Sequence, residues 1–196
     1  MAEQFTFFWH GPFSQWEFCP FEVEGIKYNC AEQYMMAKKA DIYNDMITLI
    51  AIMKSSDPKE QKALGRKVQG FNKEHWDTIA RDFVYVGNYA KFSQNPELLT
   101  KLVETQGTTL VEASPYDTIW GIGLSEKDKL ALSRDTWKGT NWLGETLTKV
   151  RDDIIAENPE LVQKIQSSNS EITGVTGIKT TTFTEKLKGL LGKLGF

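Results

Sequence analysis

The chain has 196 residues, of which 40% are hydrophobic and 25% charged, and this composition is usual for a water-soluble globular protein of one domain. Its formal net charge of −3 argues against a broad electrostatic footprint for duplex DNA, although an enzyme that takes a single nucleotide into a pocket stays open. Membrane-spanning runs, a secretory leader and metal-ligand spacing are all missing from the sequence, so we expect a cytoplasmic protein with reduced thiols, no metal and no cofactor.

The N-terminal segment predicts short strands followed by a helix. Residues 5–28 alternate aromatic, polar and turn-forming residues, with Glu24-Gly25 as a turn. A helix follows to about residue 43. Asn29 is placed to be its N-cap, and Glu32, three residues later, would complete a capping box.

Capping residues mark three further helix starts in the middle of the chain. One helix should begin at Asp57, which is followed by proline, and stop near Gly70. A second should begin at Asn72 and run through a segment dense in aromatic and aliphatic residues, which indicates burial. A third should begin at Asn95, which again precedes proline.

The rest of the folded region adds one strand and two helices. The strand is expected near residues 108–113, a short helix from Ser125 and a longer helix from about Asn141. Helices dominate, and the other strands are confined to residues 5–28. We therefore predict a mainly α fold with a small β element (α+β), carried by one domain over residues 1–157.

Residues 158–196 differ in character from the rest of the chain. Residues 167–184 are rich in Ser, Thr and Gly, which is typical of a flexible linker. The last segment places apolar residues along one face of a short helix, with three lysines off that face. We predict a docking helix that packs on its own domain, on a second copy by self-association or on another partner, but not on a membrane. The apolar residues are Phe183, Leu187, Leu190, Leu191 and Leu194.

Glu32 and Lys39 raise the question of chemistry in the helix that begins near residue 31. At about 100° per residue, residues seven apart lie about 20° from each other, so the carboxylate and the amine share one partly apolar stripe. Partial burial raises a carboxylate pKa and lowers a lysine pKa, which suits an acid–base group and a Schiff-base nucleophile. The alternatives are a capping role for Glu32 and a solvated Lys39, and Lys38 is a better candidate for the solvent-facing lysine.

Two later segments carry weaker signals. WGIG at residues 120–123 lacks the GxGxxG spacing and the βαβ context of a dinucleotide fold, and no P-loop occurs. Asn141 stands at a helix start, where it is either a plain N-cap or part of a phosphate site made by free N–H groups. Asp117 with Trp120 would either bind and stack on a base or close a turn over the core.

Several ordered motifs together resemble the NADAR superfamily, which includes the bacterial YbiA-like proteins. The resemblance covers about residues 5–152 and keeps Glu32 and Lys39, which favours chemistry over capping. The departures, at Gln15, Trp16, Gln33 and Met36, concern substrate preference. The matching motifs are FSQW (13–16), AEQYMMAKKA (31–40), LGR (64–66), Trp76 with the later KF (91–92), LVEASPYDTIWGIG (110–123) and KGTNWLGETLTKVR (138–151).

The resemblance implies a YbiA-like fold and an N-glycosidase that cleaves a ribose from an exocyclic amine. The substrate that we expect first is ADP-ribose attached to guanine in nucleic acid. Glu32 would move protons to open the furanose, and Lys39 would displace the amine as a Schiff base that water hydrolyses. Alternatives are hydrolysis of early phosphoribosylamino-pyrimidine intermediates of riboflavin synthesis, a non-catalytic ADP-ribose-binding module, and an interaction protein that works through its tail helix. Substrate-binding residues are expected at Ser14, Gln15, Trp16, Arg66, Trp76, Asp117, Trp120, Gly121 and Asn141.

Overall fold

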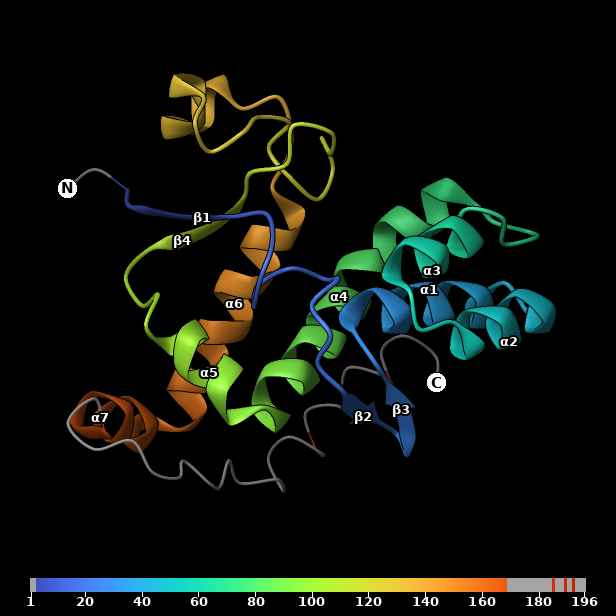
Figure 1. The fold of residues 1–196 in the computed structure, drawn as a ribbon, viewed down its shortest axis with the longest axis horizontal. Coiled ribbons are helices and arrows are strands. Elements are labelled where there is room, and N and C mark those ends of the chain that lie inside the picture. The colour runs from blue at the N-terminus through green and yellow to red at the C-terminus, as the bar shows by residue number, and fades with distance from the viewer. Residues whose placement is uncertain (1–2, 169–184, 186–188, 190–191, 193–196) are drawn as a thin grey trace. The chain divides into compact units, whose positions relative to one another are not determined.

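The computed structural model describes residues 3–168 together with residues 185, 189 and 192. Over these residues the chain is mainly helical with a small β element, as the sequence predicted (Figure 1). The apolar side chains of the predicted docking helix lie outside the described residues. The elements are β1 (Phe5–Phe8), β2 (Phe21–Val23), β3 (Ile26–Tyr28), α1 (Ala31–Ile42), α2 (Met46–Lys54), α3 (Pro58–Gly65), α4 (Lys73–Gln94), α5 (Pro96–Val103), β4 (Thr109–Glu112), the 3-10 turns η1 (Lys129–Leu132) and η2 (Arg134–Thr136), α6 (Trp142–Glu157) and α7 (Pro159–Ser168).

The chain forms two compact units. The central unit is built on Gln15–Asn95 and contains β2, β3 and α1 to α4. Among the described residues, the terminal unit comprises 3–14 and 96–168, and contains β1, β4, the two 3-10 turns and α5 to α7. The residues predicted to bind substrate are divided between these two units.

Helix α1 lies at the centre of the central unit, because α2, α3 and α4 all pack against it (Figure 1). Every residue from Ala31 to Ala40 is therefore buried, polar side chains included. The close approach of the neighbouring helices requires glycine: a Cβ on Gly65 of α3 would overlap the Met36 side chain, and one on Gly87 of α4 would overlap the Tyr34 ring. The carboxylate of Glu32 and the amines of Lys38 and Lys39 thus lie inside the unit and not on a solvent face.

The hairpin of β2 and β3 is joined to the end of α4. Its two turn residues, Glu24 and Gly25, have φ angles of 54° and 78°, as a two-residue type I′ turn requires, and this confirms the predicted turn. The backbone N–H of Glu22 donates to Gln94 Oε1 and the backbone carbonyl of Glu22 accepts from Gln94 Nε2, both at 2.8 Å. The amide of Gln94 therefore pairs with the edge of the hairpin as a neighbouring strand would.

The terminal unit is organised around β1 and β4, which pair in parallel. The carboxyl ends of the two strands consequently lie at the same edge of the pair. Helix α6 packs on β4 (Figure 1). Asn141, at the start of α6, accepts from the Glu112 N–H and donates to the Leu110 carbonyl, both at 2.9 Å, and Arg151 Nη1 donates to the Thr108 carbonyl at 2.7 Å. Polar contacts at two levels of α6 thus fix the helix to the strand.

Two predicted helix limits are wrong for reasons that lie outside the local sequence. Helix α3 ends well before Gly70, because the Gln69 N–H is held by Asp45 Oδ2 at 2.9 Å and the chain must leave the helix to reach it. The helix predicted from Ser125 is a 3-10 turn that starts later, and its cap is Asp128, which accepts from the N–H of the second residue of η1 at 2.9 Å.

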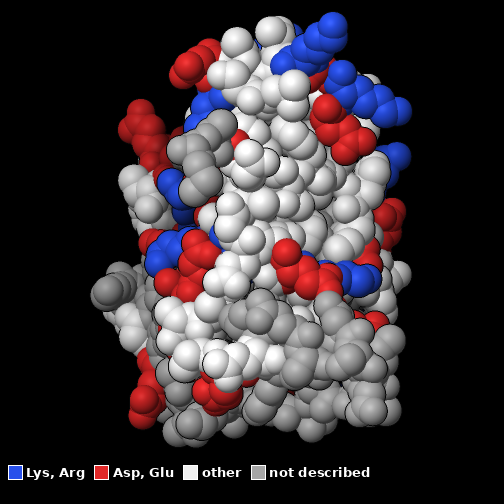
Figure 2. Space-filling view, turned by 90° about the vertical axis from the view of Figure 1, so that its left-hand side faces the viewer, with Lys and Arg blue, Asp and Glu red and all other residues white. Residues whose placement is uncertain are grey.

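Charged side chains of both signs are interspersed on the face shown in Figure 2, and neither sign forms a continuous patch there. Among the described residues, no helix is both long enough and apolar enough to cross a bilayer. In the part of the chain that the structure describes, no group of three or more His, Cys, Asp or Glu side chains is placed to hold a metal ion. Cys19 and Cys30 are buried free thiols.

Candidate active site

The start of α1 decides between the two roles open to Glu32. The N-cap is Cys30, one residue later than the predicted Asn29, and its Sγ accepts from the backbone N–H of Gln33 at 3.4 Å. Gln33 Oε1 reaches back to accept from the Asn29 N–H at 2.8 Å. The first contact is that of a capping box, and the second differs from one in reaching the N–H of the residue before the N-cap. The capping box predicted for Asn29 and Glu32 is therefore wrong, because Cys30 and Gln33 cap the helix instead.

Glu32 lies buried in the first turn of α1, with 4% of its surface exposed. Its backbone N–H donates to the carbonyl of Gln15 at 2.9 Å. Burial raises the pKa of the Cys30 thiol to about 11, and the negative charge of Glu32 adds to the rise. Cys30 is consequently a protonated thiol at neutral pH, and the group at this end of the helix that is suited to moving protons is Glu32.

Lys39 is also buried, with 9% of its surface exposed, and its Nζ lies 3.7 Å from the centroid of the Phe71 ring and 6.0 Å from that of Trp76. Burial lowers the pKa of Lys39 below its usual 10.5, and the positive charge of Arg66 lowers it further, while Glu32 acts in the opposite direction. Among the described residues no ion pair involves Lys39. A desolvated amine without a carboxylate partner is what a Schiff-base nucleophile requires.

Lys38 does not point into solvent as the sequence predicted. Only 7% of its side chain is exposed, and its Nζ lies 3.6 Å from Glu24 Oε2 and 3.7 Å from Asp41 Oδ2. The prediction fails because α1 is enclosed by its neighbours and the turn of the β2–β3 hairpin brings Glu24 to this side of the helix. The two adjacent lysines therefore differ: Lys38 is charge-paired, and Lys39 faces aromatic rings.

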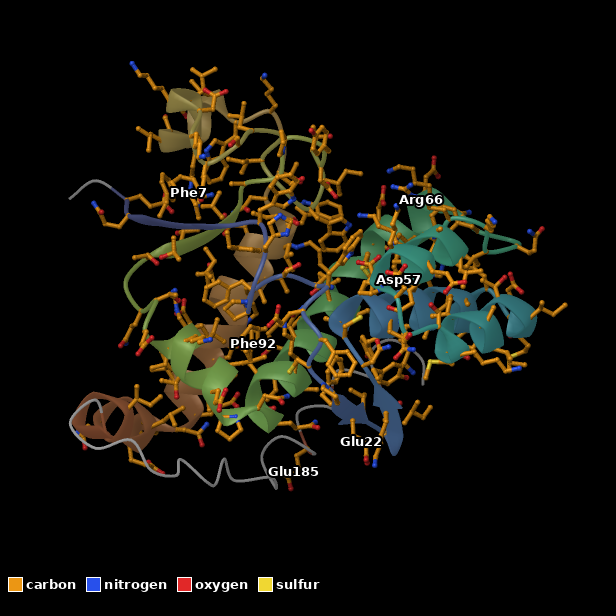
Figure 3. All side chains as sticks on the ribbon, viewed as in Figure 1. Phe7, Glu22, Asp57, Arg66, Phe92 and Glu185 are labelled. Carbon is orange, nitrogen blue, oxygen red and sulfur yellow. The ribbon has the colours of Figure 1, made fainter. Side chains whose placement is uncertain are left out.

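Arg66 and Trp76 complete the surroundings of Lys39. Arg66 is the exposed C-terminal cap of α3, and Figure 3 shows it at the opposite end of that helix from Asp57. Trp76 is buried and stacked on Phe83, with ring centroids 6.1 Å apart and an interplanar angle of 5°. Three residues that the sequence predicted for the site, Glu32, Arg66 and Trp76, thus lie around Lys39 in the central unit.

Phe71 lies against Lys39, and the sequence analysis did not name it among the candidate site residues. It precedes the N-cap of α4, and Trp76 stands at the fourth position of that helix. These are the two positions of a hydrophobic staple. The staple spacing was the one available signal for Phe71, because it pairs this ring with one already assigned to the site, and both rings lie near Lys39 Nζ.

Gln15 and Trp16 lie on the segment that contacts the start of α1. The carbonyl of Gln15 accepts from the Glu32 N–H, and its side-chain Oε1 accepts from Asn88 Nδ2 at 2.7 Å. Trp16 is 43% exposed, and Lys62 Nζ lies 5.9 Å from its ring centroid. Gln15 therefore uses both oxygens within the central unit, whereas Trp16 presents an exposed aromatic ring with a cation beside it.

Asp117 and Trp120 lie on the loop that follows β4 in the terminal unit. Asp117 Oδ1 accepts from the backbone N–H of Ile119 at 2.9 Å and from that of Trp120 at 2.7 Å. The Trp120 ring, partly exposed, meets Trp142 edge-on, with centroids 5.7 Å apart and an interplanar angle of 82°. Asp117 thus closes the turn that carries Trp120.

The other predicted residues of the terminal unit hold backbone in place. A Cβ on Gly121 would come within 2.8 Å of the Glu112 carbonyl, so only glycine fits there. Asn141 is fully buried, and its side chain bonds to β4 and does not cap α6. The backbone N–H of Ser14 donates to the Gly11 carbonyl at 2.9 Å. Gly121 and Asn141 therefore shape the loop and strand on which Asp117 and Trp120 are carried.

Comparison with known proteins places the chain in a family. Residues 7–155 match the NADAR domain family. The chain is 44% identical over 146 residues to N-glycosidase R617 of Acanthamoeba polyphaga mimivirus, covering 72% of this chain and 86% of that protein. It is 34% identical over 119 residues to the chloroplastic riboflavin biosynthesis protein PYRR of Zea mays, covering 59% of this chain and 17% of that protein. The NMR structure of YbiA from E. coli superposes with a TM-score of 0.67 at 25% identity, covering 82% of this chain and 90% of that one. The chain therefore belongs to the NADAR family.

Proposed function

We propose that this chain is an N-glycosidase that hydrolyses the bond between a ribose and an exocyclic amine, with Glu32 as the acid and base and Lys39 as the nucleophile. The observation that carries the proposal is the burial of both groups on α1, where the amine of Lys39 has a lowered pKa and no ion-pair partner among the described residues. The name of the mimivirus relative, N-glycosidase, supports the reaction class. A binding module without turnover has no use for such an amine.

The first half of the proposed reaction opens the sugar ring and transfers its C1 atom from the substrate's amine to Lys39. Glu32 gives a proton to the ring oxygen as the C1–O bond breaks, and the lone pair of the substrate's amine forms an imine at C1. The neutral amine of Lys39 then adds to C1. A proton passes through Glu32 from the Lys39 nitrogen to the substrate nitrogen, the C1–N bond to the base breaks, and the sugar is held as a Schiff base on Lys39.

The second half returns the enzyme to its starting state. Water adds to C1 of the Schiff base and gives a proton to Glu32, which passes it to the Lys39 nitrogen. The C1–N bond to Lys39 then breaks, the hydroxyl oxygen forms the aldehyde carbonyl, and the proton of that hydroxyl returns to Glu32. The open-chain aldehyde closes again to ribose. Lys39 must be neutral when it adds to C1. The lowering of its pKa by burial and by the charge of Arg66 therefore supports its assigned role.

The substrate that we propose first is ADP-ribose attached to guanine in nucleic acid. Exposed Arg66 suits a phosphate, and the exposed ring of Trp16 suits stacking on a base. The alternative is a phosphoribosylamino-pyrimidine of riboflavin synthesis, and the name of the Zea mays relative favours it. Both substrates join a ribose to an amine. In the central unit, substrate contacts are proposed for Trp16, Arg66 and Trp76, and a shaping role for Gln15. The contacts of Ser14, Asp117 and Trp120 and the shaping roles of Gly121 and Asn141 are separate proposals for the terminal unit.

The test is incubation of the purified chain with an ADP-ribosylated guanine oligonucleotide and, separately, with a phosphoribosylamino-pyrimidine, with products read by mass spectrometry. Release of the sugar from one of them, with the amine left on the base, is the expected result. Cyanoborohydride added during turnover should reduce the Schiff base and leave the sugar mass on the peptide that contains Lys39. Absence of release from both substrates would count against the N-glycosidase, and an adduct on another lysine would count against Lys39.

A further inference from the structure

Asn88 is a polar side chain buried inside the central unit that neither the motifs nor the proposed reaction uses. It lies on α4 and is fully buried. Its Nδ2 donates to Gln15 Oε1 at 2.7 Å and to the Val84 carbonyl at 2.8 Å. Its Oδ1 is buried without a hydrogen-bond partner among the described residues. Burying an amide in this way is unfavourable compared with an apolar side chain, so the contact with Gln15 calls for a reason.

Gln15 passes this contact on to the residue that we assign to proton transfer. Its carbonyl accepts from the backbone N–H of Glu32 at 2.9 Å. That N–H is one of the donors in the first helical turn that have no partner within the helix. Two hydrogen bonds therefore connect Asn88 to Glu32 through Gln15. The first joins Asn88 Nδ2 to the Gln15 side chain at 2.7 Å, and the second joins the Gln15 carbonyl to the Glu32 N–H at 2.9 Å.

The other hydrogen bonds at the start of α1 do not hold the Gln15 side chain, which Asn88 holds. Gln61, equally buried, donates through Nε2 to Asn29 Oδ1 at 3.2 Å and accepts from the Cys30 thiol at 3.2 Å. Gln61 thus holds the residues that cap α1, and the capping contacts hold the first turn. These contacts do not involve Gln15. Loss of Asn88 should consequently leave the helix in place and release the segment that fixes Glu32.

We propose that Asn88 is a positioning residue for Glu32, acting through Gln15 to keep the carboxylate where it can transfer protons. The inference rests on the proposed N-glycosidase function. A general acid must lie within hydrogen-bond reach of the atom that it protonates, and a displacement of about 1 Å can lower a rate about 100-fold. The gain in rate gives a reason for a buried amide at a position where an apolar residue would be less costly.

The test compares Asn88→Leu with Gln15→Leu and with the double variant. Asn88→Leu should lower kcat at least about tenfold and change KM by less than about threefold, because it acts on proton transfer and not on binding. Gln15→Leu should lower kcat by a similar factor. The double variant should lose no more than either single variant, since both break the same connection. Additive losses would overturn the proposed connection.

Gln61→Leu is the matched control, because it removes an equally buried amide beside the same helix start. It should lower thermal stability about as much as Asn88→Leu and leave kcat within about threefold of the wild type. In a Glu32→Gln background, Asn88→Leu should cause no further loss of the residual rate. An equal loss in Gln61→Leu, or the same further loss without Glu32, would overturn the inference in favour of a structural role.

A second measurement separates this inference from the proposed function. Absence of sugar release by the wild-type chain would overturn the N-glycosidase, and the connection would still be tested by hydrogen exchange. The amide of Glu32 should exchange at least about tenfold faster in Asn88→Leu than in Gln61→Leu, because only the former releases the carbonyl that protects it. Equal protection of the Glu32 amide in the two variants would overturn the link from Asn88 to Glu32.

Discussion

The amine of Lys39 lies 3.7 Å from the centroid of the Phe71 ring, over an aromatic face and not beside a carboxylate. An aromatic face stabilises the ammonium form modestly, whereas burial and the charge of Arg66 destabilise it. The lowered pKa of Lys39 is the net result. Lys38, its neighbour in sequence, pairs with Glu24 and Asp41, so the two lysines differ in that the described residues give Lys39 no ion pair.

Replacing Arg66 should slow the reaction at neutral pH. The positive charge of Arg66 lowers the pKa of Lys39, so Arg66→Gln raises that pKa and leaves less neutral amine at pH 7. The limb of the kcat profile along which the rate rises with pH should therefore move to higher pH. Lys59→Gln, which removes an exposed cation from the same helix, is the control and should leave the limb where it is. A limb that stays in place in Arg66→Gln would contradict the assignment of Lys39.

Replacing Glu32 should abolish turnover and spare the fold. Glu32→Gln removes the proton-transfer group but leaves the helix start, which Cys30 and Gln33 hold. We expect kcat to fall at least about 100-fold with little change in the melting temperature. Gln33→Leu, in contrast, should lower the free energy of unfolding by about 1 kcal/mol, because it removes the contacts that cap α1. Activity of Glu32→Gln within a few-fold of the wild type would show that Glu32 is not the acid and base.

Features that depend on neighbouring residues could be predicted from the sequence. The Glu24-Gly25 turn, the caps Asp57 and Asn72 and the mainly helical class are all confirmed, because each follows from local backbone preferences. The shared stripe of Glu32 and Lys39 was predictable in the same way, since it follows from helical periodicity.

Features that depend on packing between distant segments could not be predicted. Lys38 is buried because a hairpin turn brings Glu24 to it, and nothing near Lys38 in sequence announces that contact. Asn88 contacts Gln15 across 73 positions of the chain. Asn141 was placed correctly at a helix start, but its amide is used by β4, which the local pattern cannot indicate.

Removing residues 169–196 should leave activity in place. The predicted docking helix carries apolar residues on one face, which need a surface to cover them, and it holds none of the proposed catalytic groups. We expect the truncated chain to retain its rate within about threefold and to change its oligomeric state or solubility. Light scattering on both forms measures the oligomeric state, and ultracentrifugation followed by a protein assay of the supernatant measures the solubility. Equal masses and equal solubility would argue against docking between chains, and loss of activity would show that the tail contributes to the active site.

Lys91 should make the stability of the chain depend on alkaline pH. It is fully buried, and burial lowers its pKa from 10.5 to about 8. Between these two values the unfolded chain holds a proton that the folded chain has lost, so the free energy of unfolding rises with pH across this window. The shift corresponds to a gain of about 3 kcal/mol from this one group. Below about pH 8 the folded chain bears the full cost of the buried charge.

Lys91→Met tests this linkage because it removes the titrating group and keeps the length of the side chain. Urea unfolding should be measured for the wild type and the variant from pH 7 to pH 10.5. The free energy of unfolding should rise more steeply with pH in the wild type than in the variant. Lys101→Met, which replaces an exposed lysine on α5 in the same way, should follow the wild type at every pH. Parallel curves for the wild type and Lys91→Met would show that Lys91 keeps its proton in the folded chain throughout, and the buried amine would then have to be a charged one.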